Sequence, residues 1–316
     1  MRRLVLGLDT SNYTTSAAVT DADTGEILAD ERILLRVKPK EKGLRQSDAL
    51  FQHWQNLPEL LERVLPLYGK DICCVAASEK PRPQEGSYMP VFTAGVHAAR
   101  ILAAQTGAKL VMTSHQEGHI RAAACGHEGG LSPDDPLICA HLSGGTLELV
   151  LRRKDGQGGV SYEICGGTKD ISYGQLLDRM GVDLGYPFPA GKSIDDLACG
   201  YAQEGQKNPF SRVFTQKTYL NLSGLETQLK SPEIGLALSQ DAAAYFAMER
   251  VAESFCRIAD AACEETGAEN VLVTGGVACS RFLRRYCEKK DYRFGDARLC
   301  GDNAVGVSLL GGAACR

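Results

Sequence analysis

Two histidines four residues apart are the pattern in this chain that most directly suggests chemistry. His115 and His119 are two of six histidines in 316 residues, and the segment 114–119 reads SHQEGH. Residues at i and i+4 lie on one face of a helix, so both imidazoles could share one divalent metal. The alternative is an ordinary pair of solvated or hydrogen-bonded helix histidines. The surrounding sequence has to decide between these interpretations.

The residues around this pair predict that a helix begins there. The apolar run 109–112 indicates a strand, Ser114 is a suitable N-cap, and Glu117 three residues later completes a capping box. A capping role makes Glu117 only a weak candidate for a general base. The sequence offers no other convincing base, so the catalytic residue is unassigned.

Length and composition predict a folded protein with more than one lobe. The chain has 316 residues, of which 44% are hydrophobic and 23% charged, as in ordinary globular proteins. The net charge of −4 and the pI near 5.9 exclude a protein that binds nucleic acid through its overall charge, so any such role needs a local patch or a partner. No leader and no apolar run near 18 residues is recognisable, which predicts a cytoplasmic protein without a membrane segment.

The twelve cysteines predict free thiols rather than a disulfide framework. No CxxC pair occurs, and several cysteines, such as Cys74 and Cys139, lie in apolar segments. Buried thiols in a reducing compartment fit this pattern, and a thiolate zinc site has little support.

A weak internal repeat predicts two related α/β lobes. Residues 3–9 and 16–19 form apolar strands around a Ser/Thr-rich turn, and residues 137–141 and 147–151 repeat this hairpin around the turn 143–146. We expect an N-terminal lobe over 1–132, which the last helix at 303–316 could complete. The C-terminal lobe would cover 133–302, with the boundary near 128–136.

Three tight turns rich in glycine and hydroxyl residues indicate a nucleotide. They lie at 10–15, at 143–146 and at 275–276, each directly after an apolar strand. Backbone N–H groups exposed in such turns can hold phosphate oxygens. Each turn alone is weak evidence, but together they predict a nucleotide between the two lobes.

The remaining segments predict helices at 172–184, at 193–203 and from about Pro232 to Thr266, and a last helix after residue 303. Asp302 precedes that last helix, where an aspartate also serves as an ordinary N-cap. Two basic clusters are candidate RNA contacts, although such runs are usually solvated surface. They comprise Arg32, Arg36, Lys38, Lys40, Lys42 and Arg45, and then Arg281, Arg284, Arg285, Lys289, Lys290 and Arg293.

Nearly the whole chain resembles the TsaD/Kae/Gcp family, which makes threonylcarbamoyladenosine in transfer RNA. The family belongs to the actin, sugar kinase and heat-shock (ASKHA) superfamily, with two related RNase H-like lobes and with nucleotide and metal in the inter-lobe cleft. Its HxEGH motif matches residues 115–119, and its C-x-D-N segment matches residues 300–303. The resemblance implies that His115, His119 and Asp302 bind one divalent metal, Fe²⁺ or Zn²⁺.

The same resemblance implies a set of substrate- and nucleotide-binding residues. The family's V-S-G-G loop corresponds to 142–145, its ribose-contacting carboxylate to Asp178, and its G-G-V segment to 275–277. Ser280 stands where the family has a nucleotide-contacting asparagine. The implied set is Leu142, Ser143, Gly144, Gly145, Asp178, Gly191, Asp195, Gly275, Gly276 and Ser280.

Several departures from the family pattern indicate a divergent paralogue. The family's E-T-S-C-D-E-T segment reads DTSNYTT at 9–15, so its acidic pair is absent. Thr146 replaces the histidine that follows V-S-G-G, and Glu226 replaces a lysine. The metal and nucleotide elements are retained, whereas parts of the catalytic centre are not.

The resemblance implies an acyltransferase that uses threonylcarbamoyl-AMP to modify the transfer-RNA adenosine next to the anticodon. The adenine amine would attack the threonylcarbamoyl carbonyl and AMP would leave, with partner proteins of the same pathway assisting. Two alternatives are a non-catalytic or regulatory paralogue that binds nucleotide and metal, and a carbamoyltransferase that acts on a small molecule.

Overall fold

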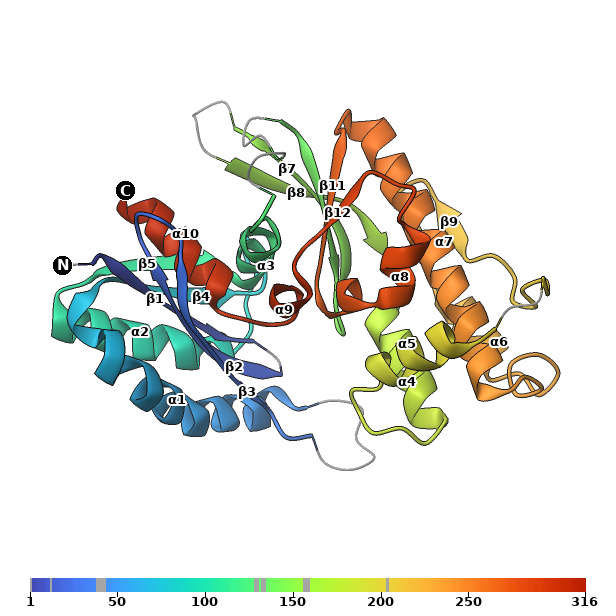
Figure 1. Cartoon of the computed structure of the whole chain (residues 1–316), viewed down its shortest axis with the longest axis horizontal. Coiled ribbons are helices and arrows are strands. Elements are labelled where there is room, and N and C mark those ends of the chain that lie inside the picture. The colour runs from blue at the N-terminus through green and yellow to red at the C-terminus, as the bar shows by residue number, and fades with distance from the viewer. Residues whose placement is uncertain are drawn as a thin grey trace. The chain divides into compact units, whose positions relative to one another are not determined.

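The structure of the protein is a computed structural model that describes residues 2–11, 13–37, 44–127, 131, 135–155, 160–202 and 205–316. Asn12, the lysines Lys38, Lys40 and Lys42 of the first basic cluster, and most of the predicted boundary segment 128–136 lie outside the described residues. The chain divides into two compact units, shown in Figure 1. The first comprises Met1–Lys38, Gly43–Cys125 and Arg298–Arg316, and the second Pro39–Lys42 and Gly126–Ala297.

The first unit is built on a five-stranded sheet in the order β3-β2-β1-β4-β5. Its strands are β1 (Leu4–Thr10), β2 (Thr14–Asp21), β3 (Ile27–Leu34), β4 (Ile72–Lys80) and β5 (Lys109–Ser114). The first three strands form an antiparallel meander, and β4 and β5 run parallel to β1. Every residue of β1 is buried, as expected of a central strand that is covered on both faces.

Helices cover both faces of this sheet. They are α1 (Gln46–Tyr68), the short helix η1 (Gly69–Asp71), α2 (Phe92–Thr106), α3 (His115–Ala123) and α10 (Val305–Cys315). On one face, Leu57 and Leu60 of α1 pack with Leu6 and Leu8 of β1. On the other, α10 packs against β1 and β4. Alternate residues of β1 therefore face different helices, and this alternation fixes which face carries α10.

The second unit repeats the same sheet topology. Its seven-stranded sheet has the order β12-β11-β6-β7-β8-β10-β9, in which β8-β7-β6-β11-β12 corresponds to β3-β2-β1-β4-β5 of the first unit. The strands are β6 (Leu137–Leu142), β7 (Leu147–Lys154), β8 (Val160–Thr168), β9 (Phe214–Gln216), β10 (Tyr219–Asn221), β11 (Asn270–Thr274) and β12 (Tyr292–Phe294). The predicted duplication of an α/β lobe is confirmed.

The second unit contains the helices predicted at 172–184 and 193–203, although the second of these ends at Gly200, and it contains a helix at Ser223–Leu229 that was not predicted. Its helices are α4 (Tyr173–Asp183), α5 (Gly191–Gly200), α6 (Ser223–Leu229), α7 (Gln240–Thr266), η2 (Gly276–Cys279) and α8 (Arg281–Tyr286), and α9 (Ala297–Cys300) follows where the unit ends. The predicted start of the long helix at Pro232 is wrong, because residues 232–237 form turns. A Cβ at Gly235 would lie 2.1 Å from the carbonyl oxygen of Leu229, so this segment folds back on the end of α6.

No helix among the described residues has the length and apolar character needed to cross a membrane.

Glycines let α3 and α10 pack backbone against backbone. A Cβ added to Gly306 of α10 would lie 1.8 Å from the carbonyl oxygen of Gly118 in α3, and a Cβ on Gly118 would lie 3.0 Å from Val307. On the sheet side, a Cβ on Gly7 of β1 would lie 2.6 Å from the carbonyl oxygen of Ala304. No side chain larger than hydrogen fits at Gly306 or Gly7 without displacing backbone.

Gly306→Ala is expected to lower the free energy of unfolding by about 3 kcal/mol or more, because rotating a side chain cannot relieve a clash with a carbonyl group. The matched control is Gly224→Ala in α6, where an added Cβ meets nothing within 4 Å. That change should stabilise the protein by about 0.5 kcal/mol. Urea denaturation followed by circular dichroism measures both. Equal stability of the two variants would contradict the tight contact.

Candidate metal centre

Three side chains of the first unit bring their ligand atoms together. His115 and His119 lie on α3, and Asp302 lies in the turn before α10. The Nε2 atom of His119 is 3.0 Å from Nε2 of His115 and 3.3 Å from Oδ1 of Asp302. The distance from His115 Nε2 to Asp302 Oδ1 is 3.7 Å. The contact of α3 with α10 thus joins residues 183 positions apart in the chain.

These distances fit a shared metal ion. Ligand atoms that bind one ion at about 2.1 Å, with tetrahedral or octahedral angles, lie about 3.0–3.4 Å apart. Two imidazole nitrogens and one carboxylate oxygen form a donor set that suits Zn²⁺ or Fe²⁺. His119 is buried with a side-chain exposure of 2%, whereas Asp302 is 23% exposed. The cluster can therefore hold a divalent metal with one side open to other ligands.

A buried carboxylate orients the first of these histidines. Asp9 ends the apolar part of β1 with no exposed surface, and its Oδ2 accepts a hydrogen bond of 2.8 Å from Nδ1 of His115. Its Oδ1 accepts a hydrogen bond from the hydroxyl of Ser78 on β4. With Nδ1 acting as donor, Nε2 of His115 presents its lone pair toward His119 and Asp302, as in carboxylate–histidine–metal triads.

This role of Asp9 was not predicted from the sequence. Its signal was a carboxylate near the end of a strand whose preceding residues are apolar, because aspartate is almost never fully buried without a partner. That signal identifies a paired acid but not its partner.

The electrostatics of the cluster favour positive charge. Desolvation lowers the pKa of His115, but the charge and hydrogen bond of Asp9, together with the charge of Asp302, outweigh it and raise that pKa to about 9. The pKa of His119 is lowered by desolvation and by the charge on His115. Two carboxylates beside one buried and one half-buried imidazole thus favour a cation at this position, whether a proton or a metal ion.

Glu117 of the HxEGH segment serves as a helix cap. Its Oε2 accepts hydrogen bonds from the backbone N–H of Ser114 at 2.9 Å and from the Ser114 hydroxyl at 2.6 Å. The hydroxyl of Ser114 accepts in turn from the backbone N–H of Glu117. The predicted capping box is confirmed.

The predicted glycine turns of the second unit lie together. A Cβ on Gly275 would lie 2.3 Å from the carbonyl oxygen of Leu142, so the turns after β6 and β11 are in backbone contact. The start of α4 joins them, because the hydroxyl of Ser172 donates to the carbonyl of Gly144 at 2.9 Å. A Cβ on Gly144, Gly145 or Gly276 would meet nothing within 4 Å, so these backbones border open space where a ligand can lie.

Three polar residues of the predicted nucleotide set, Asp178, Asp195 and Ser280, form hydrogen bonds within the second unit. Oδ1 of Asp178 accepts the backbone N–H groups of Ala190 at 2.8 Å and Gly191 at 3.0 Å, which ties α4 to the start of α5. Burial raises the pKa of Asp178. Asp195 accepts from the hydroxyl of Ser280 and from the first N–H groups of α8. Both aspartates therefore have structural partners, and their contact with a nucleotide stays a prediction.

Removing any ligand side chain should abolish tight metal binding. His115→Ala, His119→Ala and Asp302→Ala each leave two donors, which hold a divalent ion much more weakly than three. His97→Ala, which removes an exposed histidine of α2, is the control and should keep its metal. Metal content after dialysis, measured by inductively coupled plasma mass spectrometry, tests this. Full metal retention in any of the three variants would exclude that residue as a ligand.

Asp9→Asn should weaken metal binding by about 10- to 100-fold, because an amide no longer supplies the negative charge that orients and polarises His115. Asp23→Asn is the matched control, since Asp23 is 54% exposed and pairs with Arg3. Competition with a chromogenic chelator measures both affinities. An unchanged affinity in Asp9→Asn would remove Asp9 from the site.

Comparison with known proteins places the chain in a family. The family model described as TsaD, tRNA N6-adenosine threonylcarbamoyltransferase, matches residues 26–308. A tRNA N6-adenosine threonylcarbamoyltransferase from Methanopyrus kandleri is 31% identical, with 92% of this chain and 81% of that protein covered. One from Neorickettsia sennetsu is 27% identical, with 96% and 92% covered.

Solved structures support the fold at low sequence identity. The (R)-2-hydroxyglutaryl-CoA dehydratase component A of Acidaminococcus fermentans superposes with a TM-score of 0.58 at 15% identity, covering 98% of each chain. A ROK family glucokinase from Streptomyces griseus gives 0.53 at 11% identity, covering 98% of this chain and 99% of that one. The chain therefore shares the two-lobed α/β fold of these proteins, and it belongs to the TsaD family of transferases.

Proposed function

We propose that this protein transfers a threonylcarbamoyl group from threonylcarbamoyl-AMP to the N6 amine of the transfer-RNA adenosine next to the anticodon, using one divalent metal, Fe²⁺ or Zn²⁺. The observation that carries the proposal is the convergence of His115, His119 and Asp302 within bonding distance of one ion. Membership of the TsaD family supports the reaction and the transfer-RNA substrate. We place the reaction in the cytoplasm with partner proteins of the same pathway.

Under this proposal, residues of the first unit would bind the metal and residues of the second unit would bind the adenylate. His115, His119 and Asp302 would hold the metal, and Asp9 would keep the His115 ring in the tautomer that binds it. A bound divalent ion supplies a Lewis acid that polarises a carbonyl and stabilises the negative charge developing on it. The open backbones of Gly144, Gly145 and Gly276 would hold the phosphate of the adenylate. Holding the adenylate in one orientation favours attack by the adenine amine.

A non-catalytic paralogue is the second candidate function. The hydroxyl of Ser280 donates to Asp195, and Asp195 also accepts the backbone N–H groups of Arg281 and Phe282. These bonds hold α8 in place. They thereby occupy Ser280 and Asp195, two of the residues expected to contact a nucleotide. Such a protein would bind metal and adenylate without transferring the acyl group.

The decisive assay incubates the purified protein with threonylcarbamoyl-AMP and unmodified transfer RNA, with and without partner proteins, and detects the modified nucleoside by mass spectrometry. We expect the wild-type protein to form product. The rate of product formation should fall by about a hundredfold or more in Asp302→Ala, because that variant lacks one ligand of the metal that would stabilise negative charge on the carbonyl. His97→Ala should react at the wild-type rate.

The same assay separates the two candidates. Absence of product under every combination, while the wild-type protein still binds metal and adenylate, would exclude the transferase and support the non-catalytic paralogue. Product formation that is equal in wild type and Asp302→Ala would keep the transfer reaction but overturn the assigned metal centre.

A further inference from the structure

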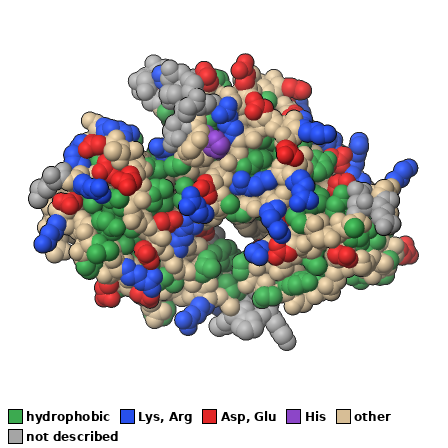
Figure 2. Space-filling view, in the orientation of Figure 1, with side chains coloured by type: hydrophobic (Ala, Val, Ile, Leu, Met, Phe, Trp, Pro, Cys, Tyr) green, Lys and Arg blue, Asp and Glu red, His purple; other side chains and the backbone are tan. Residues whose placement is uncertain are grey.

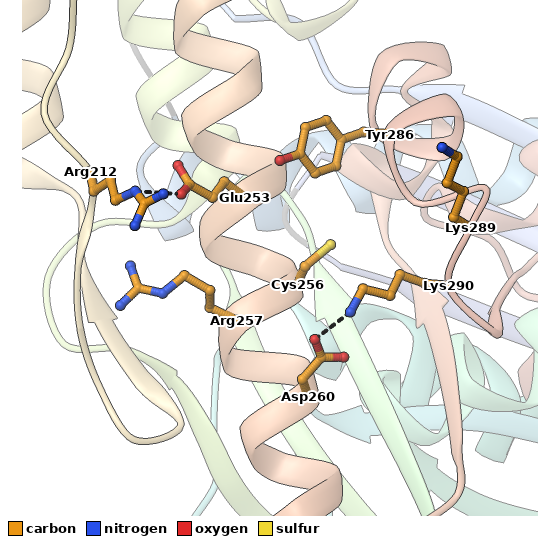
Figure 3. A pocket seen from close by; sticks show the side chains of 8 residues that line it. All are labelled: Arg212, Glu253, Cys256, Arg257, Asp260, Tyr286, Lys289 and Lys290. Atoms are coloured by element: carbon orange, nitrogen blue, oxygen red, sulfur yellow. Dashed lines mark hydrogen bonds and ion pairs between the residues drawn. The ribbon is translucent and has the colours of Figure 1, made fainter. Parts of the chain in front are cut away.

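A pocket of about 410 Å³ opens on the second unit, apart from the glycine turns. Its floor is one face of α7, where Glu253, Cys256, Arg257 and Asp260 recur at helical spacing. Figure 3 shows these side chains pointing into the same space as side chains from two flanking segments. The flanking residues are Arg212, from the segment before β9, and Tyr286, Lys289 and Lys290, from the end of α8 and the loop after it.

Positive charge exceeds negative charge around this pocket. Four cations and two carboxylates line it. Arg212 pairs with Glu253 at 2.8 Å, and Lys290 pairs with Asp260 at 2.6 Å. Both carboxylates are therefore already engaged. The surplus charge resides on the two remaining cations, Arg257 and Lys289.

These two cations are available to a ligand. Both are exposed, and neither has a carboxylate partner in the described part of the chain. One nitrogen of Arg257 donates to the carbonyl of Val213 at 3.2 Å, which fixes its guanidinium at the pocket wall and leaves further N–H groups. Guanidinium and ammonium groups both bind phosphate, and here they approach the pocket from different elements, Arg257 from α7 and Lys289 from the loop after α8 (Figure 3).

An aromatic ring completes the pocket. Tyr286 is 42% exposed and lies beside Lys289 at the pocket edge (Figure 3). Arg285, the preceding residue, is also exposed, and Lys and Arg side chains gather over α8 in Figure 2. An exposed ring next to unpaired cations offers a stacking surface for a base beside contacts for phosphates. An inorganic anion would gain nothing from the ring, so the arrangement favours a nucleic-acid strand.

We infer that this pocket binds single-stranded RNA, with backbone phosphates on Arg257 and Lys289 and a base against Tyr286. The inference rests on the proposed function only in taking transfer RNA as the natural source of that strand. It also accounts for how a chain of net charge −4 can bind RNA, because the positive charge is local.

The test is fluorescence anisotropy with a fluorescein-labelled oligouridylate, titrated at several salt concentrations. The double variant R257A/K289A should weaken binding at low salt by about tenfold or more. It should also reduce the slope of log K against log salt by about 1.4, since each phosphate contact on a single strand contributes about 0.7. The matched control is R153A/K217A, which removes two exposed, carboxylate-paired cations of the same unit. An equal effect of both double variants on RNA binding would contradict the assignment of Arg257 and Lys289 as phosphate contacts.

The base contact is tested separately. Tyr286→Ala should weaken binding of the oligouridylate by about fivefold or more with an unchanged salt slope, whereas Tyr286→Phe should bind like wild type because it keeps the ring. Circular dichroism and metal content check that each variant is folded. A Tyr286→Ala variant that binds like wild type would overturn the stacking contact.

Further arms distinguish the source of the phosphate and the dependence on the proposed function. If pyrophosphate binding is lost in R257A/K289A while RNA binding is unchanged, the ligand is a free phosphate compound and the RNA inference is overturned. Weaker binding of unmodified transfer RNA by R257A/K289A supports it. If the wild-type protein binds RNA through this pocket yet forms no threonylcarbamoyl product, the proposed function fails alone. If R257A/K289A binds transfer RNA like wild type and the wild-type protein forms product, the RNA-binding role of the pocket is wrong while the proposed function stands.

Discussion

The candidate metal centre depends on the backbone contact between α3 and α10. Its ligand atoms come from both sides of this contact and lie 3.0–3.7 Å apart, so a shift of about 1 Å would remove the geometry. Gly118 lies between the two histidines on α3, and Gly306 lies four residues after Asp302. The absence of a side chain at Gly306 lets the helices approach, and Gly7 allows the same helix to rest on β1. Gly306 and Gly7 thus support the metal centre by letting backbones approach closely, and neither supplies a ligand atom.

Burial of Asp9 shows how the sheet contributes to the same centre. A fully buried carboxylate is unfavourable unless hydrogen bonds compensate for its lost hydration. Here His115 and the Ser78 hydroxyl supply those bonds from different elements. The arrangement leaves the carboxylate charge next to the imidazoles, where it favours a bound cation. The unfavourable burial of one acid is thereby converted into electrostatic support for a metal site.

The features that the sequence predicts correctly have local determinants. The capping box of Ser114 and Glu117 and the two hairpin meanders are set by neighbouring residues, and both were predicted. Asp302 was predicted as a metal ligand only through a family resemblance, and the role of Asp9 was not predicted. Asp302 lies 183 positions from His119, and Asp9 lies 106 positions from His115, so no local pattern connects them. The start of α7 was placed too early because Ser-Pro at 231–232 resembles a helix start. The contact of Gly235 with the end of α6 keeps this segment out of the helix, and the helix-start signal at 231–232 does not reveal that contact.

Duplication explains how one scaffold can serve two ligands. The pair Thr10–Thr15 closes the first hairpin and Leu142–Leu147 closes its counterpart, so Asp9 and His141 occupy equivalent positions at the ends of β1 and β6. In the first unit this strand end supplies a carboxylate to the imidazoles of α3. In the second it leads into the Ser143–Gly145 turn, whose backbone borders open space. The sheet gives each unit a rigid strand end, and under the proposed function the residues at that end would support a metal in the first unit and a phosphate in the second. Because the two units share one sheet topology, a difference between their ligands would have to come from the residues at these strand ends and in the turns that follow them.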